Sequence, residues 1–256
     1  MAIEGNLDYA LARIQARQGQ RLEEADWRRL EANRDLGLYL AAMRTTSLAD
    51  WVGSFDVEHD CHTFERVLRA RWRRYVEAVA AWHPIATQAW LAWLAWLPAL
   101  SLLAPLARPE PAPGWILADP LLGPLSLGTP EERVAMLTNT PLAPLRGALA
   151  TRADLSAAWA ARWDDLRPAL DGPALRSLAR FRQTVRRHEH DVEHAVDGAE
   201  PLRSELARAL LRLLRLGAGT VIVTLCHLAL TALDIERLRG GLARRSIFGS
   251  TEAEQH

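Results

Sequence analysis

The sequence contains no lysine, and its 31 basic residues, all of them arginine, are balanced by 31 acidic residues to a formal net charge of zero. A chain without net charge has no overall field that would draw it to nucleic acid or to an anionic membrane, so we expect no nucleic-acid partner. The exclusive use of arginine is typical of a GC-rich genome, and we expect a bacterial origin.

Cysteine is also scarce. The two cysteines, Cys61 and Cys226, lie far apart and neither belongs to a CxxC pair, which argues against a disulfide framework or a zinc knuckle. The first twenty residues lack the basic start, the apolar run and the cleavage site of a secretory signal. We therefore expect a protein of the cytoplasm.

The motifs of nucleophilic and nucleotide chemistry are absent too. The sequence has no GxSxG, no GxGxxG and no glycine-rich phosphate loop ending in a basic residue. Paired carboxylates such as Asp164 and Asp165 stand beside arginines, where surface ion pairing is the usual explanation. We expect no catalytic residues, no cofactor and no enzymatic activity of the chain itself.

What the sequence does contain is 49% hydrophobic residues arranged with helical periodicity, without an alternating strand pattern of useful length. The expected fold class is therefore all-α. Helices are predicted over residues 6–17, 23–43, 62–82, 153–166, 173–195, 201–216 and 221–247.

Prolines crowd together between residues 105 and 144, which excludes long helices there apart from the short one that EERVAML favours. This segment is the natural boundary between two lobes. The predicted organisation is a first helical module with the N-terminal helices over 1–108, a proline-rich connection over 109–130, a second module with the closing helix over 131–249, and a frayed polar tail over 250–256.

Two stretches without formal charge, 85–107 and 216–233, reach the length of a membrane-spanning helix. We interpret the first as a buried helix broken near Pro98, because its tryptophans recur every three residues instead of gathering at the two ends (Trp90, Trp93 and Trp96). The second runs directly into Asp234 and is interpreted as a central helix packed on all sides. An integral membrane protein is the alternative.

The strongest signal for a metal is RRHEHDVEH, in which His190 and His194 stand four residues apart on one helical face, with His188 and Glu193 close by. We favour a solvated polar helix end. The alternative is a helical-bundle metal-binding protein or metalloenzyme that uses these four residues together with ligands from a facing helix.

A second group of metal-ligating residue types lies in DVEHDCHTFE. Adjacent residues rarely converge on one ion, and we expect Asp60 to be the N-cap of the helix that follows. A histidine in an apolar helix, such as His227, is more often a hydrogen-bonded core residue than a ligand.

The segment YALARIQARQGQRLEEADWRRL resembles the start of the C (or d) subunit of the V-type and archaeal-type (A-type) ATPases. The matching residues are Tyr9, Ala12, Arg13, Arg17 and Leu22. The segment LALTALDIERLRGGLARRSIFG is similar to the closing helix of the same family. The matching residues there are Asp234, Ile235, Glu236, Leu238, Arg239, Arg244, Arg245, Phe248 and Gly249.

Between the two ends, the chain resembles the helical module that this family repeats. One copy is matched by Phe64, Glu65, Leu68, Arg69 and Tyr75, and LGPLSLGTPEERVAMLTNTPLAPL resembles the start of a second. The resemblance implies helical repeat modules that form a funnel-like body, with the N- and C-terminal helices packed together. The length leaves room for fewer than the family's usual three modules.

The resemblance also implies a function, that of a non-catalytic coupling subunit in the central stalk of a V-type rotary ATPase. The implied partners are the central-shaft subunits of the soluble head and the membrane c-ring that carries the ions, with a peripheral location on the cytoplasmic face of the inner membrane. The expected partner-interface residues lie on arginine-rich helix faces, and ion pairing within the chain is the alternative for them (Arg13, Arg17, Arg71, Arg74 and Arg239).

Overall fold

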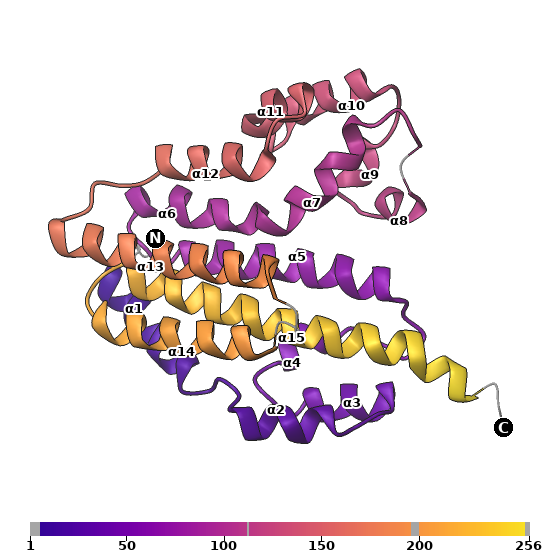
Figure 1. Ribbon diagram of the computed structural model, residues 1–256, viewed down its shortest axis with the longest axis horizontal. Helices are drawn as coiled ribbons and strands as arrows, with labels where there is room; N and C mark the ends of the chain where they lie inside the picture. Colours follow the sequence, from indigo (N-terminus) through magenta and orange to yellow (C-terminus); the bar gives the residue numbers. More distant parts are fainter. Residues whose placement is uncertain (1–5, 112, 196–199, 254–256) are drawn as a thin grey trace, which may run out of the picture. The chain divides into compact units, whose positions relative to one another are not determined.

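The computed structural model describes residues 6–111, 113–195 and 200–253, and within these ranges the chain is helical and contains no strand (Figure 1). The predicted all-α class is thereby confirmed. The funnel-like body and the repeat modules remain predictions.

The chain divides into two compact units, each built from segments that are distant in the sequence. The first unit comprises Met1–Leu68, Ala81–Ile85 and Ala169–His256, and the second comprises Arg69–Ala80 and Ala86–Pro168. The predicted proline-rich connection over 109–130 lies within the second unit. The two modules predicted along the chain stay a prediction.

The first unit begins with three helices, and a side chain caps each of them. Asn6 accepts from the backbone N–H of Asp8 at the start of α1 (Leu7–Gln18), and Glu23 and Asp26 form a capping box on α2 (Glu24–Glu31). Asp35 accepts from the backbone N–H of Leu38 at the start of α3 (Leu36–Met43). The short helix α4 (Ala49–Val52) follows.

The single helix predicted over 23–43 is wrong, because the chain breaks between α2 and α3. The side-chain amide of Asn33 donates to the carbonyl of Leu30, and the Asp35 carboxylate caps the next helix. Side chains of this type compete with the helical ladder for backbone groups, which ends one helix and starts another.

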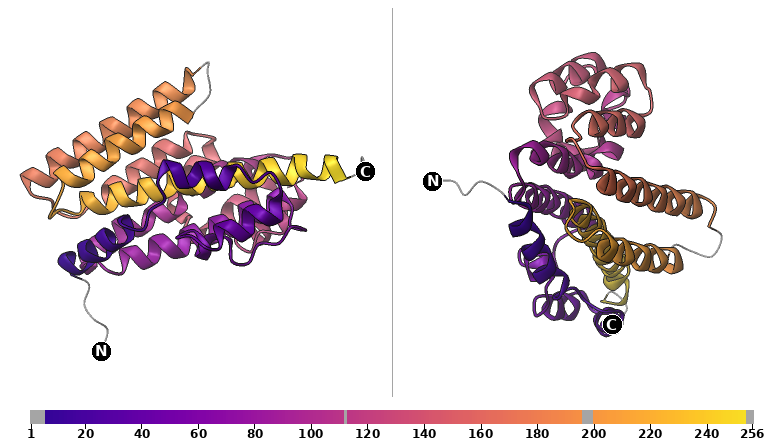
Figure 2. Two further views of the ribbon diagram at one scale, coloured as in Figure 1. Left: turned by 90° about the horizontal axis from the view of Figure 1, so that it is seen from below. Right: turned by 90° about the vertical axis from the view of Figure 1, so that its left-hand side faces the viewer.

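The remaining helices of the first unit are α13 (Gly172–Glu193), α14 (Glu200–Leu216) and α15 (Ile222–Ala253), which pack against one another (Figure 2). α1 and α3 also pack on α15, so the N- and C-terminal helices lie together as predicted. Residues 221–228 are all buried, which agrees with a central helix over this stretch. α15 continues through the first residues of the predicted tail to Ala253, and residues 254–256 lie outside the described ranges.

The second unit is organised around tryptophans. It contains most of α5 (Cys61–Ala80) and α6 (Ile85–Ala92), followed by a 3-10 segment, Trp93–Ala99, in which Pro98 interrupts the α-helix as predicted. The tryptophan stripe faces the core, since Trp90, Trp93 and Trp96 are all buried. The indole N–H of Trp93 donates to the carbonyl of Trp159, and that of Trp159 donates back to the carbonyl of Trp93. α12 (Leu155–Asp165) supplies this partner and Trp163, which stacks on Trp90 with ring centroids 5.0 Å apart.

Among the described residues, the stretch Ile85–Ala107 is the one helical run that is long and apolar enough to cross a membrane, and about a third of its most apolar window is buried inside the protein. It is assembled from α6, the 3-10 segment, α7 (Leu100–Leu103) and a short 3-10 turn, Ala104–Ala107.

The proline-rich part of the second unit holds only short helices, as predicted. These are α8 (Gly114–Leu117), α9 (Leu122–Leu125), α10 (Pro130–Met136) and α11 (Arg146–Thr151). Two buried polar side chains organise the loops between them. Arg133 donates to the carbonyls of Gly128, Arg108 and Glu110, and Asp119 accepts from Arg69 and from two backbone N–H groups.

Candidate functional site

α15 faces the first helices of the chain through a row of charged and polar side chains, which we call the polar seam. Its members are Gln18, Arg21, Glu24, Glu31, Tyr39, His227, Asp234, Arg237 and Arg245. All of them belong to the first unit. The seam is the structural meeting point of the two segments that carry the family resemblance.

The most enclosed ion pair of the polar seam joins Arg21, just after α1, to Asp234 of α15. The guanidinium donates from Nε to Oδ2 at 2.7 Å and from Nη2 to Oδ1 at 2.8 Å, a bidentate geometry that fixes both position and orientation. Burial raises the pKa of Asp234, and the hydrogen bonds from Arg21 act against this rise. The carboxylate of Asp234 therefore depends on Arg21 for its counter-charge.

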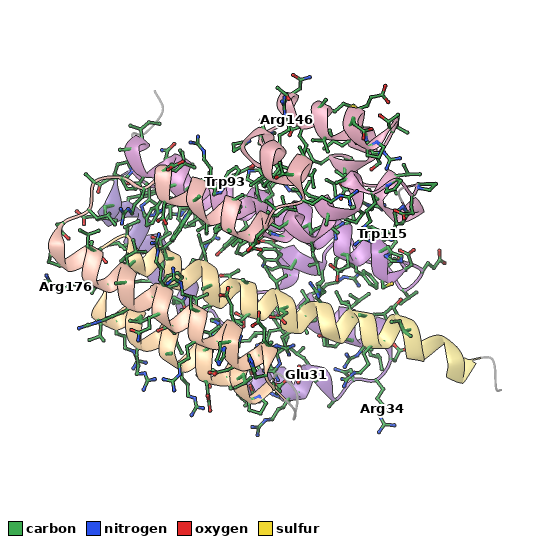
Figure 3. All side chains as sticks on the ribbon, turned by 45° about the horizontal axis from the view of Figure 1, so that its top comes forward. Glu31, Arg34, Trp93, Trp115, Arg146 and Arg176 are labelled. Carbon is green, nitrogen blue, oxygen red and sulfur yellow. The ribbon has the colours of Figure 1, made fainter. Side chains whose placement is uncertain are left out.

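One helical turn further along α15, Arg237 binds two carboxylates of α2. It donates to both oxygens of Glu31 at 2.6 and 2.8 Å and to Glu24 at 2.7 Å, and it lies over the ring of Trp27. The hydrogen bond from Arg237 lowers the pKa of Glu24. Glu31 lies beside α15, whereas Arg34 extends away from the helices (Figure 3). Because Glu24 and Glu31 are the first and last residues of α2, Arg237 holds both ends of α2 against α15.

Arg245, the last residue of the polar seam along α15, donates hydrogen bonds to backbone carbonyls. It donates to the carbonyls of Glu31 and Asn33, at the end of α2, and to that of Gly241 in its own helix. Only 4% of Arg245 is exposed, and its guanidinium lies 3.8 Å from the centroid of the Tyr39 ring. Burial lowers the pKa of Arg245 and raises that of Tyr39 to about 12.

Two buried histidines lie in the same unit, and neither is arranged as a metal ligand. The side-chain nitrogen of Gln18 lies 2.7 Å from Nδ1 of His227, and the hydroxyl of Thr224 lies 3.0 Å from Nε2 of His83. Burial lowers the pKa of each histidine to about 4. His227 is therefore a hydrogen-bonded core residue, as the sequence predicts.

The five predicted interface arginines do not form one cluster in either unit. Arg13 and Arg17 both lie over the ring of Trp82, at 4.6 and 4.8 Å from its centroid. Arg239, which is 55% exposed, pairs with Glu65 at 2.9 Å. Arg239 is thus engaged in an ion pair within the chain, whereas the contacts of Arg13 and Arg17 with Trp82 are cation–π contacts.

The other two predicted interface arginines, Arg71 and Arg74, belong to the second unit. Arg74 is exposed and Arg71 is half-buried, on the segment of α5 that also carries Arg69 and Arg73. Arg69 pairs with Asp119, and Arg73 lies over the ring of Trp96. Arg74 is therefore the member of this basic face that is best placed to meet another molecule.

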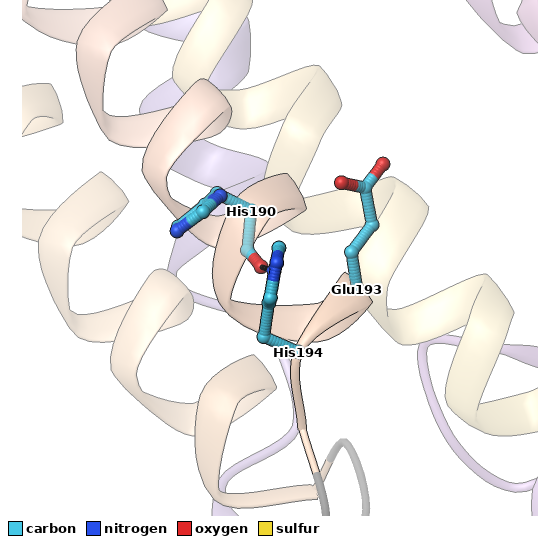
Figure 4. A group of neighbouring side chains, drawn as sticks. All are labelled: His190, Glu193 and His194. Atoms are coloured by element: carbon cyan, nitrogen blue, oxygen red, sulfur yellow. Dashed lines mark hydrogen bonds between the residues drawn. The ribbon is translucent and has the colours of Figure 1, made fainter.

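The predicted metal ligands lie at the C-terminal end of α13, and three of the four come together. His190, Glu193 and His194 each offer a ligand atom, and these atoms all lie within 4.8 Å of one another (Figure 4). All three side chains are exposed, which agrees with the favoured interpretation of a solvated helix end. His188 is not a member of the group.

In the second group of metal-ligating residue types, in DVEHDCHTFE, Asp60 caps the next helix as predicted. Asp60 accepts from the backbone N–H of Thr63 at the start of α5. Hydrogen bonds from the side chain and from the backbone N–H of Thr63 lower the pKa of Asp60. Nδ1 of His59 accepts from the backbone N–H of Asp56.

Most partners in the polar seam escape prediction from the sequence. Asp234 is noted there as the end of the uncharged stretch and, like Arg245, for its family resemblance, and Arg237 is not singled out. A usable signal does exist, because Asp234 directly follows the uncharged stretch 216–233, and a carboxylate that enters a buried helix needs a partner. Nothing in the sequence says that this partner is Arg21.

Comparison with known proteins gives no relative for this chain. No family model, no curated protein and no solved structure matches it.

Proposed function

We propose that this protein is a non-catalytic coupling subunit of a V-type rotary ATPase, linking the rotor shaft of the soluble head to the membrane ring that carries the ions. The observation that carries the proposal is the polar seam. The two segments that resemble the family lie some 200 residues apart, yet Arg21 and Asp234 join them in one half-buried bidentate pair.

A coupling subunit has to transmit twist without letting its helices slide past one another. Apolar contacts are non-directional and tolerate small displacements, whereas a bidentate arginine–carboxylate pair has one favourable geometry. Arg21, Arg237 and Arg245 each hold α15 to a different point on the first helices. This arrangement supports a stiff body in the first unit, and it would serve a rotor component well.

The proposed partners are the central-shaft subunits and the c-ring of the rotary ATPase, with peripheral association at the cytoplasmic face of the inner membrane through protein contacts. Arg74 is the proposed contact of the second unit, because it is the exposed member of the basic face of α5. No catalytic group and no cofactor enter this proposal.

The test is affinity purification of a tagged chain from native membranes after mild crosslinking, followed by mass spectrometry. We expect the shaft subunits and the ring subunit of a rotary ATPase to be recovered in stoichiometric amounts. Recovery of the protein alone, or with unrelated enzymes only, would overturn the proposal.

A charge-reversal pair refines the experiment. Arg74→Glu should reduce the recovery of ATPase subunits several-fold, whereas Arg176→Glu should leave it unchanged. Arg176 is also an exposed helical arginine, but it lies on α13 in the first unit and points away from the helices (Figure 3). Equal losses in both variants would remove Arg74 from the proposed interface.

A further inference from the structure

We propose that the C-terminal turn of α13 is a surface site for a divalent transition-metal ion such as Zn²⁺, held by His190, Glu193 and His194. The proposal does not rest on the coupling function. It differs from a bundle-core metal centre, because one helix supplies all three ligands and, within residues 6–111, 113–195 and 200–253, no other group of three ligand side chains comes together.

The spacing of the three residues places them on one face of the helix. Positions three and four residues apart are neighbours on a helical surface, so Glu193 and His194 both lie next to His190. The two imidazole centroids are 4.3 Å apart, and the three ligand atoms lie within 4.8 Å of one another. Ligands of a tetrahedral Zn²⁺ ion lie about 3.4 Å apart, given bond lengths near 2.1 Å. Exposed side chains can close this difference by rotation about their own bonds.

A backbone hydrogen bond prepares one of the imidazoles for a metal. Nδ1 of His194 lies 2.8 Å from the carbonyl oxygen of His190 (Figure 4). A carbonyl can only accept, so Nδ1 carries the proton and donates it, which leaves the lone pair on Nε2. Metal-ligating histidines characteristically donate their other ring N–H in this way, which fixes the tautomer and orients the ring.

The surroundings also favour a cation. α13 ends at Glu193, and the partial negative charge at the C-terminus of a helix stabilises positive charge in its last turn. The carboxylate of Glu193 supplies a full negative charge. Two imidazoles and one carboxylate suit Zn²⁺, Ni²⁺ and Cu²⁺ better than Mg²⁺ or Ca²⁺, which prefer an all-oxygen shell. Three protein ligands leave a fourth position for water.

Zn²⁺ titration of the full-length protein by isothermal calorimetry tests the site, after removal of metal with a chelator. We expect one equivalent to bind with a Kd below about 100 µM. His190→Ala and His194→Ala should each weaken binding about tenfold or more, and Glu193→Gln should have a smaller effect. All three side chains are exposed, so each variant should keep the helical circular dichroism of the parent.

His188→Ala is the matched control, because His188 lies on the same helix but outside the ligand group. It should bind Zn²⁺ as the parent does. Co²⁺ gives a second readout, since a bound ion in a tetrahedral site produces intense visible absorption that the His190→Ala/His194→Ala double variant should lack. The proposal is overturned by the absence of one-to-one binding, by binding that survives in the double variant, or by an equal loss in His188→Ala.

Discussion

Tryptophan rings fill the core of the second unit, whereas charged side chains join the first helices to α15 in the first unit. In the second unit, Trp93 and Trp159 exchange indole hydrogen bonds with each other's carbonyls, and Trp163 stacks between Trp90 and Trp159. In the first unit, Arg21 and Asp234 form a half-buried bidentate pair. Ring packing gains free energy from the area removed from water, whereas the bidentate pair has one favourable geometry. The two units therefore reach a defined structure by different routes.

The largest expected effect is on the second unit. Trp159→Ala removes a stacked ring and a hydrogen bond from its core, so we expect the free energy of unfolding to fall by about 3–5 kcal/mol. Chemical denaturation measures the loss of stability. Hydrogen exchange under native conditions locates it, and the loss of protection should concentrate in residues 86–168.

Trp159→Phe is the control for this substitution. It keeps an aromatic ring but leaves the carbonyl of Trp93 without its indole donor, so the loss should be about 1–2 kcal/mol. Equal losses in the two variants would mean that the hydrogen bonds, and not the rings, dominate this core.

Breaking the Arg21–Asp234 ion pair tests the first unit in the same way. Arg21→Met leaves the half-buried Asp234 carboxyl without its hydrogen-bonded partner, and we expect a loss of about 2–3 kcal/mol in denaturant unfolding. The double variant Arg21→Met/Asp234→Leu replaces both charges with apolar groups and should recover most of that loss. A double variant as unstable as the single one would show that the pair itself contributes net stability, and the contrast between the two units would disappear.

The stability of the two units should also differ in its response to acid, because all eight histidines belong to the first unit. Burial lowers the pKa of His83 to about 4, and burial together with Arg17 and Arg21 lowers the pKa of His227 to about 4. The ordinary value is about 6.5, so the unfolded chain binds more protons between these limits. The resulting stability is complete above pH 6.5 and is lost as the pH falls toward 4.

The expected loss between pH 7 and pH 5 is about 2 kcal/mol for each of these histidines. Hydrogen exchange at the two pH values, corrected for the intrinsic exchange rate, should show weaker protection in the first unit and little change in the second. His227→Gln should remove about half of the pH dependence. An equal acid response in both units would contradict the assignment.

The sequence predicts the second unit better than the first, for a physical reason. A stripe of tryptophans with helical spacing and a proline that breaks the helix are local signals, and both appear in the structure at Trp90, Trp93 and Pro98. The partners of the polar seam lie more than 200 residues apart, as with Arg21 and Asp234, and no local pattern pairs them. The ligand group on α13 can be predicted because its residues have helical spacing. The hydrogen bond that sets the tautomer of His194 depends on the orientation of its ring, which the spacing does not give.

Two adjacent glycines of α15 test how closely the polar seam is packed. A Cβ on Gly241 would collide with the hydroxyl of Tyr39, the ring that Arg245 covers, whereas a Cβ on Gly240 would meet nothing within 4 Å. Gly241→Ala should therefore destabilise the protein by about 1–3 kcal/mol through overpacking. Gly240→Ala should stabilise it by up to about 1 kcal/mol, because alanine is the better helix former. Thermal unfolding of the pair measures both. If Gly241→Ala were also stabilising, α3 could move away from α15 at little cost, and the first unit would lack the stiffness on which the proposed coupling function depends.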